Sequence, residues 1–147
     1  MKNNSSPKPL SIIIYDHHYD KIHYALVMAA AAAAIGQPTT LFFTMGACNA
    51  LFCNDEEGNP AWSKMPLSDS KKTGRERNDF YRREGIATFE ELINACITFK
   101  TKFMICELGL KAKQLENFVL RKDLKIEPGG AVTFLKEASK NSSILFI

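Results

Sequence analysis

Long hydrophobic runs are missing from this sequence of 147 residues. The longest, residues 24–35, is rich in alanine and much shorter than the roughly 20 residues that a helix needs to span a bilayer. The polar start, residues 1–9, contains no apolar segment of the kind found in signal peptides. We therefore expect a cytoplasmic protein with no membrane partner and with a flexible tail at residues 1–9.

A strong excess of charge of one sign is also missing. The formal net charge of +3 is too small to indicate binding to nucleic acid or to an anionic membrane. The joint after the first predicted strand, residues 16–21, contains no glycine. This argues against the glycine-rich phosphate loops of dinucleotide- and ATP-binding proteins, so we expect no such cofactor.

Cysteine is scarce, and its spacing matches no common motif. The four cysteines include no C-x-x-C pair, which excludes the zinc-ribbon and thioredoxin motifs. In the cytoplasm they should be mostly reduced thiols. Cys96 lies on the apolar stripe of a predicted helix and should be a core residue. Nothing in the sequence gives Cys53 a role.

What the sequence does contain is an alternation of strand-like and helix-like segments. A β-branched run, a helical periodicity and a second apolar run follow one another closely, which is typical of a βαβ unit with parallel strands. The patterns predict strands over residues 10–15, 39–43, 103–106, 124–126 and 143–147, and helices over residues 21–35, 89–97, 110–119 and 131–139. This order predicts a three-layer α/β domain with a mostly parallel sheet.

Several predicted helix ends carry recognisable capping residues. Asp20 is placed to cap the first helix, and Gly36 is placed just past its end. Thr88 and Glu91 have the spacing of a capping box. Residues 128–130, Pro-Gly-Gly, are predicted to form a turn.

Residues 54–85 differ in character from the rest of the single domain predicted over residues 10–147. They contain prolines, glycines and charges of both signs, with little apolar periodicity, so we expect a long surface excursion formed by a solvated loop. Its second half, residues 71–83, is locally basic, and an anion or partner site there is the alternative. The side chains available to dock an acidic partner are Arg75, Arg77, Arg82 and Arg83.

Polar or reactive side chains follow three of the predicted strands. Because ligands of open parallel sheets gather outside the carboxyl ends of the strands, we expect these side chains to line one pocket. Cys106 is the main candidate for chemistry, since free N–H groups of the following helix favour the thiolate, the reactive form of cysteine. The other expected pocket residues are Asp16, His17, His18, Thr44, Met45, Gly46, Cys48 and Glu107.

Other kinds of chemistry have weaker support. His17, His18 and Cys106 are metal-ligand types, but their spacing is not typical of a metal site, so we expect no metal. A Cys–His pair for acyl transfer lacks an identifiable orienting residue. Cys48 is a candidate resolving thiol for Cys106, although a structural role is more common for a cysteine.

The chain also resembles a family, the DsrE/DsrF/DsrH-like sulfur-relay proteins, and within it the DsrE-like, peroxiredoxin-like branch. The likeness comes from an alanine-rich first helix, a Phe-Phe-Thr strand and turn, an aliphatic strand that ends in cysteine, a Gly-Gly-Ala-Val-Thr turn and helix, and a Leu-Phe-Ile ending. These segments are residues 24–36, 39–46, 103–110, 129–135 and 144–147.

The resemblance implies a five-stranded α/β/α sandwich that assembles as a homotrimer or hexamer. It also implies a persulfide-carrying cysteine at Cys106, with sulfur donor and acceptor proteins as partners and no cofactor. Related members often have Cys-Gln-Met-Ser-Met after the strand, whereas this chain has Glu107, a negative charge, directly after the cysteine. We expect His17, His18 and Thr44 to line the pocket and polarise the sulfur.

Two further functions remain open at this point. One is a non-catalytic oligomer that binds a small ligand, or regulates, through the strand-end cleft. The other is a thiol redox sensor in which Cys106 forms a sulfenic acid or pairs with Cys48.

Overall fold

The computed structural model describes residues 7–138 and 141–147. The predicted tail lies mainly in residues 1–6, which are outside the described residues. Residues 7–9 have no regular secondary structure, but they are attached to the domain. The carbonyl of Pro9 accepts a hydrogen bond from the amide of Ser143, at 2.8 Å.

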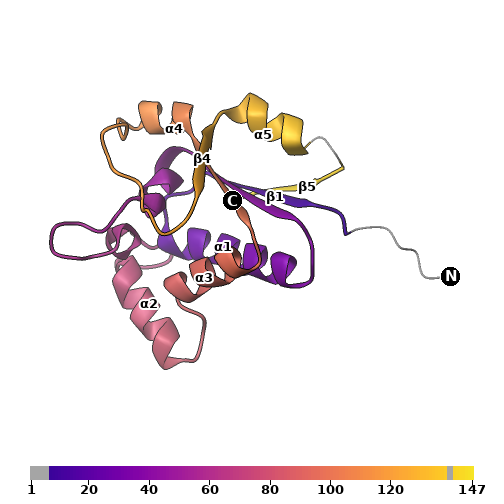
Figure 1. Ribbon diagram of the computed structural model, residues 1–147. Helices are drawn as coiled ribbons and strands as arrows, with labels where there is room; N and C mark the ends of the chain where they lie inside the picture. Colours follow the sequence, from indigo (N-terminus) through magenta and orange to yellow (C-terminus); the bar gives the residue numbers. More distant parts are fainter. Residues whose placement is uncertain (1–6, 139–140) are drawn as a thin grey trace.

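The fold is a five-stranded sheet with helices on both faces (Figure 1). The elements are β1 (Leu10–Ile14), α1 (Tyr19–Ala34), β2 (Thr39–Phe43), η1 (Met45–Leu51), η2 (Ala61–Lys64), α2 (Gly74–Arg83), α3 (Phe89–Thr98), β3 (Lys102–Cys106), α4 (Glu107–Ala112), β4 (Ile126–Gly129), α5 (Ala131–Ala138) and β5 (Ser143–Phe146). The strands are ordered β4-β3-β2-β1-β5, and every pairing is parallel. The predicted three-layer α/β class is confirmed.

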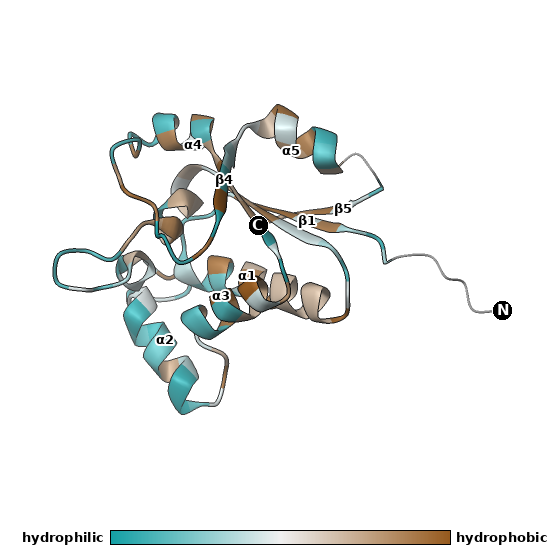
Figure 2. Ribbon diagram, viewed as in Figure 1, coloured by the Kyte–Doolittle hydropathy of each residue, from teal (hydrophilic) through white to brown (hydrophobic). Residues whose placement is uncertain are grey.

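The two faces of the sheet are covered unequally. Helices α1 and α3 lie against one face, and α4 and α5 lie on the other (Figure 1). The larger core, which includes Ile12, Leu41 and Phe103, faces α1 and α3, whereas Phe42 and Met104 form a smaller cluster with α5. Figure 2 shows the resulting pattern, with apolar strands at the centre and polar residues on the outer surfaces of the helices. The catalytic candidate, Cys106, belongs to the smaller cluster.

The first helix packs closely because its inner face is made of small residues. Ala25, Ala29 and Ala32 are buried against the sheet, and alanine has the highest helix propensity. The helix ends as predicted, with Gly36 just beyond it at a φ of 83°, a conformation that favours glycine.

The predicted capping role of Asp20 is wrong. Helix α1 begins at Tyr19, with His18 at the N-cap position. The Asp20 carboxylate instead accepts hydrogen bonds from the amide and the hydroxyl of Ser68. It thereby ties the segment of residues 54–85 to the first turn of α1.

Helix α3 has the predicted N-terminal capping box, in which the side chains of Thr88 and Glu91 each bond the other's backbone amide. Its buried face carries Cys96, as expected. The next residue, Ile97, is 40% exposed and lies outside this buried face.

The C-terminal part departs furthest from the predicted boundaries. The helix expected over residues 110–119 begins directly after Cys106 and ends at Ala112. Strand β4 lies later than expected and includes Pro128, which was predicted to be in a turn. Proline fits there because β4 is an edge strand, where a missing N–H leaves no neighbour unpaired.

The expectation of a solvated loop over residues 54–85 is also wrong. The segment contains η2 and α2, and the side chain of Trp62 is buried in the main core. Asn78 of α2 is buried as well, and its Oδ1 accepts hydrogen bonds from the Tyr19 hydroxyl at 2.8 Å and from the Phe89 amide at 2.9 Å. The segment is therefore a structural part of the domain, docked on α1 and α3.

Across the described residues, no helix combines the length and the apolar character that a membrane crossing requires.

Candidate functional site

The carboxyl ends of β1, β2 and β3 meet, as the strand order requires. A Cβ on Gly46, after β2, would lie 2.6 Å from the Cβ of His17, which follows β1. A Cβ on Gly109, after β3, would lie 2.9 Å from the hydroxyl of Thr44. Two glycines thus let the three strand-end segments approach one another.

Cys106 occupies the position where β3 becomes α4. It is the N-cap of α4, and its Sγ accepts a hydrogen bond from the Gly109 amide at 3.4 Å. Its side chain packs with Phe42, Met104 and Phe134 on the α5 face of the sheet and is only 4% exposed. The sulfur therefore has an amide donor that supports negative charge, but it does not lie open to solvent.

Glu107 and Leu108 lie on the outside of this turn. Both side chains are exposed, and Leu108 is 71% exposed. Glu107 is the first residue of α4, where the free N–H groups of a helix favour an acidic side chain. Its carboxylate therefore faces solvent rather than a closed pocket around the thiol.

Cys48 lies in the interior, not on a pocket wall. It is fully buried in η1, and its thiol donates to the carbonyl of Phe43 at 3.7 Å. Burial, and then the neighbouring Cys106 thiol, raise the pKa of Cys48 to about 12. Cys48 is thus a protonated thiol at neutral pH, which makes it a poor resolving nucleophile.

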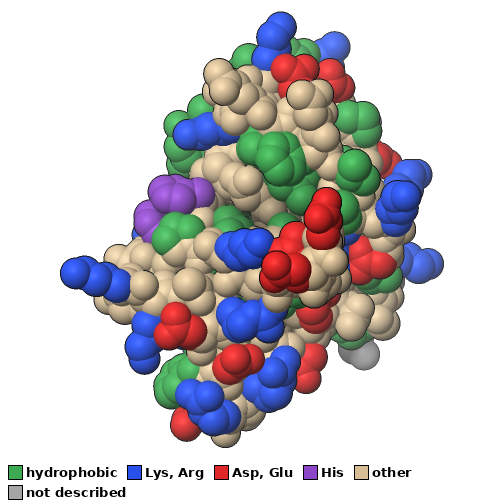
Figure 3. Space-filling model, turned by 90° about the vertical axis from the view of Figure 1, so that its left-hand side faces the viewer, with side chains coloured by type: hydrophobic (Ala, Val, Ile, Leu, Met, Phe, Trp, Pro, Cys, Tyr) green, Lys and Arg blue, Asp and Glu red, His purple; other side chains and the backbone are tan. Residues whose placement is uncertain are grey.

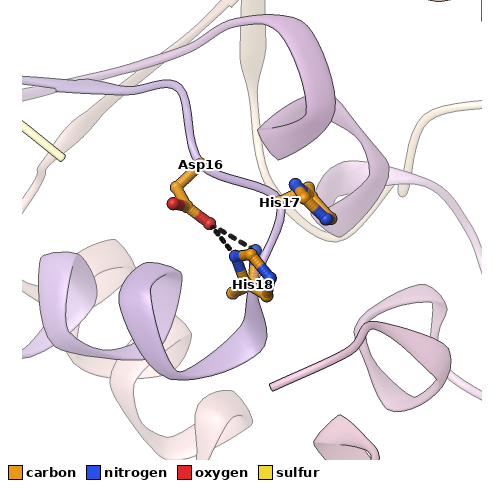
Figure 4. A group of neighbouring side chains, drawn as sticks. All are labelled: Asp16, His17 and His18. Atoms are coloured by element: carbon orange, nitrogen blue, oxygen red, sulfur yellow. Dashed lines mark hydrogen bonds and ion pairs between the residues drawn. The ribbon is translucent and has the colours of Figure 1, made fainter. Parts of the chain in front are cut away.

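The residues after β1 form a compact group (Figure 4). Asp16 Oδ1 accepts hydrogen bonds from the His18 amide at 2.7 Å and from His18 Nδ1 at 2.6 Å. The ring centroids of His17 and His18 lie 4.1 Å apart. Partial burial raises the pKa of Asp16, but the hydrogen bonds from His18 outweigh it and hold the pKa below its usual value.

Met45 has an unusual backbone. Its φ of 50° lies in the left-handed region, which a bulky residue rarely adopts. This bend directs the chain from β2 into η1. The backbone of Met45 also lies close to Gly109, since a Cβ added to that glycine would lie 2.5 Å from the Met45 nitrogen. The turn after β2 and the start of α4 therefore fix each other.

A cavity that the sequence does not indicate lies beside these residues. It has a volume of about 460 Å³, and of the expected pocket residues only His17 lines it. Its apolar walls include Phe52 and Phe118, whose rings stack with centroids 5.0 Å apart. Cys53, an exposed thiol, is also on its wall.

No sequence signal identifies this cavity, because its walls come from irregular segments far apart in the chain. The segments around residues 52–53 and 118–120 are joined by a short antiparallel bridge, with the Cys53 amide donating to the Val119 carbonyl at 2.9 Å. Such a bridge has no periodicity that a pattern could detect.

The basic residues of α2 are mostly paired with acidic or polar ones. Arg77 bonds Asp69 at 2.6 Å, and Arg82 bonds Asp79 at 3.3 Å. Arg75 donates to the side chain of Asn59, at 2.9 Å. Figure 3 shows the same mixture, with acidic and basic side chains interspersed over the lower half of the face in view. The surface of α2 therefore carries charges of both signs rather than an excess of positive charge.

The sheet order, the parallel pairing and the two helical layers define a protein with a DsrE-like fold. A solved structure that shares this fold is the crystal structure of the ychN protein from E. coli. The two match with a TM-score of 0.55 over 95% of this chain and 99% of that chain, at 9% sequence identity.

At that identity the likeness concerns the fold alone. No protein-family model matches the sequence. No curated protein matches it either.

Proposed function

We propose that the protein is a sulfur carrier in which Cys106 holds a persulfide. The observation that carries the proposal is the hydrogen bond from the Gly109 amide to Cys106 Sγ, at a strand end of a DsrE-like fold. An amide aimed at sulfur stabilises the thiolate, and a thiolate is the form that exchanges sulfur.

The reaction needs no cofactor and no net oxidation. The Cys106 thiolate attacks the outer sulfur of a donor persulfide, R–S–SH, and the donor leaves as R–S⁻. The proton stays on the transferred sulfur, so the product is Cys106–S–SH. A thiolate of an acceptor protein then attacks this outer sulfur, takes it, and releases the Cys106 thiolate. A reducing compartment such as the cytoplasm suits this chemistry.

Access to the sulfur requires a movement of α4. Cys106 is buried, whereas α4 is a single short helix whose Leu108 side chain is exposed at its start. The helix is held at Gly109, against Met45, and by the partly buried Leu110, whereas its other four residues are exposed. We propose that a donor or acceptor protein binds against Leu108 and Glu107 and displaces this turn.

We also propose that the chain forms a homo-oligomer through the uncovered end of the α5 face. In parallel pairing, Ile144 lies opposite Ser11 and Phe146 opposite Ile13, and Ile13 packs on the α5 face. Ile144 is 46% exposed and Phe146 67% exposed, although both stand on that face. The ring of Tyr15 lies 5.8 Å from that of Phe146 and extends the same apolar surface. A second copy of the chain would bury it.

The oligomer is tested by sedimentation velocity on the wild type and on Phe146→Asp. We expect the wild type to sediment as a trimer or hexamer and Phe146→Asp to dissociate. Phe80→Asp, at an exposed phenylalanine of α2, is the matched control and should leave the assembly intact. A monomeric wild type, or a Phe146→Asp protein that remains assembled, contradicts this interface.

The sulfur-carrier proposal is tested by intact-protein mass spectrometry after incubation with a cysteine desulfurase and cysteine. We expect the wild type to gain one sulfur atom and Cys106→Ser to gain none. Cys53→Ser removes the exposed thiol and should gain sulfur like the wild type. Sulfur on Cys53 alone, or no adduct at all, would overturn the proposal.

A second function, binding of a small ligand, is favoured by the cavity of about 460 Å³. The stacked Phe52 and Phe118 rings suit a flat apolar molecule. Phe118→Ala should weaken such binding, whereas Cys106→Ser should not affect it. The redox-sensor alternative receives less support, because burial keeps Cys48 protonated.

A further inference from the structure

Three consecutive residues after β1 bring metal-ligand atoms together. One nitrogen from each of His17 and His18 and one carboxylate oxygen of Asp16 all lie within 4.8 Å of one another. The spacing in the sequence is not that of a common metal motif. The bend between β1 and α1 creates the group instead, and Figure 4 shows Asp16 and His18 joined by hydrogen bonds, with the His17 ring beside His18.

The hydrogen bond between Asp16 and His18 determines which nitrogen of the His18 ring carries the hydrogen. Asp16 Oδ1 lies 2.6 Å from His18 Nδ1, and an ionised carboxylate can only accept a hydrogen bond. Nδ1 of His18 therefore carries a hydrogen, and in the neutral ring Nε2 has the free lone pair. A carboxylate that accepts from one imidazole nitrogen while the other faces a cation is the usual arrangement around metal-binding histidines.

The second imidazole is held beside the first. His17 packs against Gly46. A larger residue at position 46 would displace the His17 side chain, since its Cβ would lie 2.6 Å from the His17 Cβ. The two ring centroids lie 4.1 Å apart. Two imidazole nitrogens on one tetrahedral zinc ion, at zinc–nitrogen distances of about 2.0–2.1 Å, are about 3.4 Å apart. Small side-chain rotations can bring the two rings to that separation.

The site is open on one side. His17 is exposed and lies on the wall of the cavity, while Asp16 and His18 side chains are 30% and 28% exposed. The third histidine of the chain, His23, is buried and bonds the Ala87 carbonyl, so it does not belong to the group. Figure 3 shows histidine side chains at the surface on one edge of the molecule, where a cation from solvent can reach them.

We propose that His17 and His18 bind a divalent cation of the zinc type, with Asp16 as the positioning residue that holds the His18 ring. Imidazole nitrogens suit zinc, cobalt, nickel and copper ions rather than magnesium or calcium. Water or a small ligand in the cavity would complete the coordination, as in zinc sites that keep open positions. This site is separate from the thiol of Cys106 and does not depend on the sulfur-carrier proposal.

The test is titration of the full chain, free of any histidine tag and stripped of metal, with Co²⁺ followed by visible absorption and with Zn²⁺ followed by calorimetry. We expect one ion per chain. His17→Ala and His18→Ala should each weaken binding at least about 10-fold, since each removes a ligand. Asp16→Ala, which removes the hydrogen bonds to the His18 ring and amide, should weaken it by about 10-fold to 100-fold.

Three controls separate this site from other sources of binding. Tyr15→Phe changes the exposed residue directly before Asp16 without removing a metal ligand, and this variant should bind the metal ion as the wild type does. Cys106→Ser and Cys53→Ser should also bind normally, and the cobalt spectrum should lack a sulfur-to-metal band. Loss of binding in either cysteine variant would place the ion on a thiol and overturn the proposal.

Two other outcomes also overturn it. One is a wild type that binds neither ion, and the other is a His17→Ala/His18→Ala double variant that binds both as the wild type does. Folding of the variants is checked by thermal unfolding. If His18→Ala fails to fold, His17→Gln at the exposed ring provides the same test without removing buried contacts.

Discussion

Gly109 lies so close to Met45 that a Cβ at this glycine would come within 2.5 Å of the Met45 nitrogen. The contact joins the first turn of α4 to the turn after β2, and the amide of the same glycine bonds Cys106 Sγ. One residue therefore sets both the position of the helix and the hydrogen bond to the thiol.

Gly109→Ala should destabilise the fold by about 1–3 kcal/mol, because the backbone of Met45 cannot move away as a flexible side chain would. Urea unfolding measures this change. Gly130→Ala is the matched control, since a Cβ there meets nothing within 4 Å, and it should change stability by less than about 0.5 kcal/mol. Equal effects of the two substitutions would contradict the close approach.

Asn78→Ala should destabilise the protein by about 2–3 kcal/mol, since it leaves the Tyr19 hydroxyl and the Phe89 amide without their acceptor in the interior. Asp79→Ala, at the next and more exposed position of α2, should have a much smaller effect. Thermal or urea unfolding of the two variants compares them. Similar stabilities would mean that α2 is not anchored through Asn78.

The four thiols should alkylate in a defined order. Cys53 is exposed and should react first with iodoacetamide, Cys106 should follow as α4 opens, and Cys48 and Cys96 should react only on wider unfolding. Peptide mass spectrometry after timed quenching gives the four rates. If Cys106 reacts as fast as Cys53 in the native protein, α4 does not shield the sulfur.

Stability should depend on pH through His23. Burial lowers the pKa of this ring below its ordinary value of about 6.5, although the hydrogen bond to the Ala87 carbonyl acts in the opposite direction. The unfolded chain then binds a proton more readily than the folded one. The free energy of unfolding should therefore fall as the pH falls below about 6.5, by at most about 1.4 kcal/mol per pH unit.

Urea titrations at pH values between about 7.5 and 5.5 measure this slope. His23→Gln keeps a donor for the Ala87 carbonyl but has no proton to gain, so its slope should be shallower than that of the wild type. An identical slope would assign the pH dependence to other groups.

The three central strands were predictable from the sequence because they are apolar runs buried on both faces. Strand β2 has the predicted bounds, and β1 and β3 differ from them by one residue. Sequence also located Cys106 at a strand end, and it predicted that the segments after β1, β2 and β3 approach one another. That part follows from strand order alone, since parallel strands place their carboxyl ends on one edge.

Helix α2 was missed because its buried face is not apolar. The residues it buries are Gly74 and Asn78, so no hydrophobic periodicity marks the helix. The signal that was available is the capping box of Thr73 and Glu76, which has the same spacing as the one recognised at Thr88.

The burial of Cys106 was missed for a different reason. The sequence shows that a helix follows β3, but not that α5 crosses close enough for Phe134 to pack beside the sulfur. Nor does it show which side chains meet around the cavity, because Phe52 and Phe118 come from irregular segments. Both features depend on long-range packing rather than on local pattern.

The pairing of β1 with β5 has a consequence during synthesis of the chain. Strand β1 can pair with β2 soon after both emerge from the ribosome, but its other edge stays bare until residues 143–146 arrive. At about 5–20 residues per second, translation of the intervening stretch leaves that edge open for roughly 5 to 20 seconds. An unpaired strand edge is a template for association with other chains. A chaperone that covers the open edge of β1 would therefore prevent nascent molecules from pairing with one another.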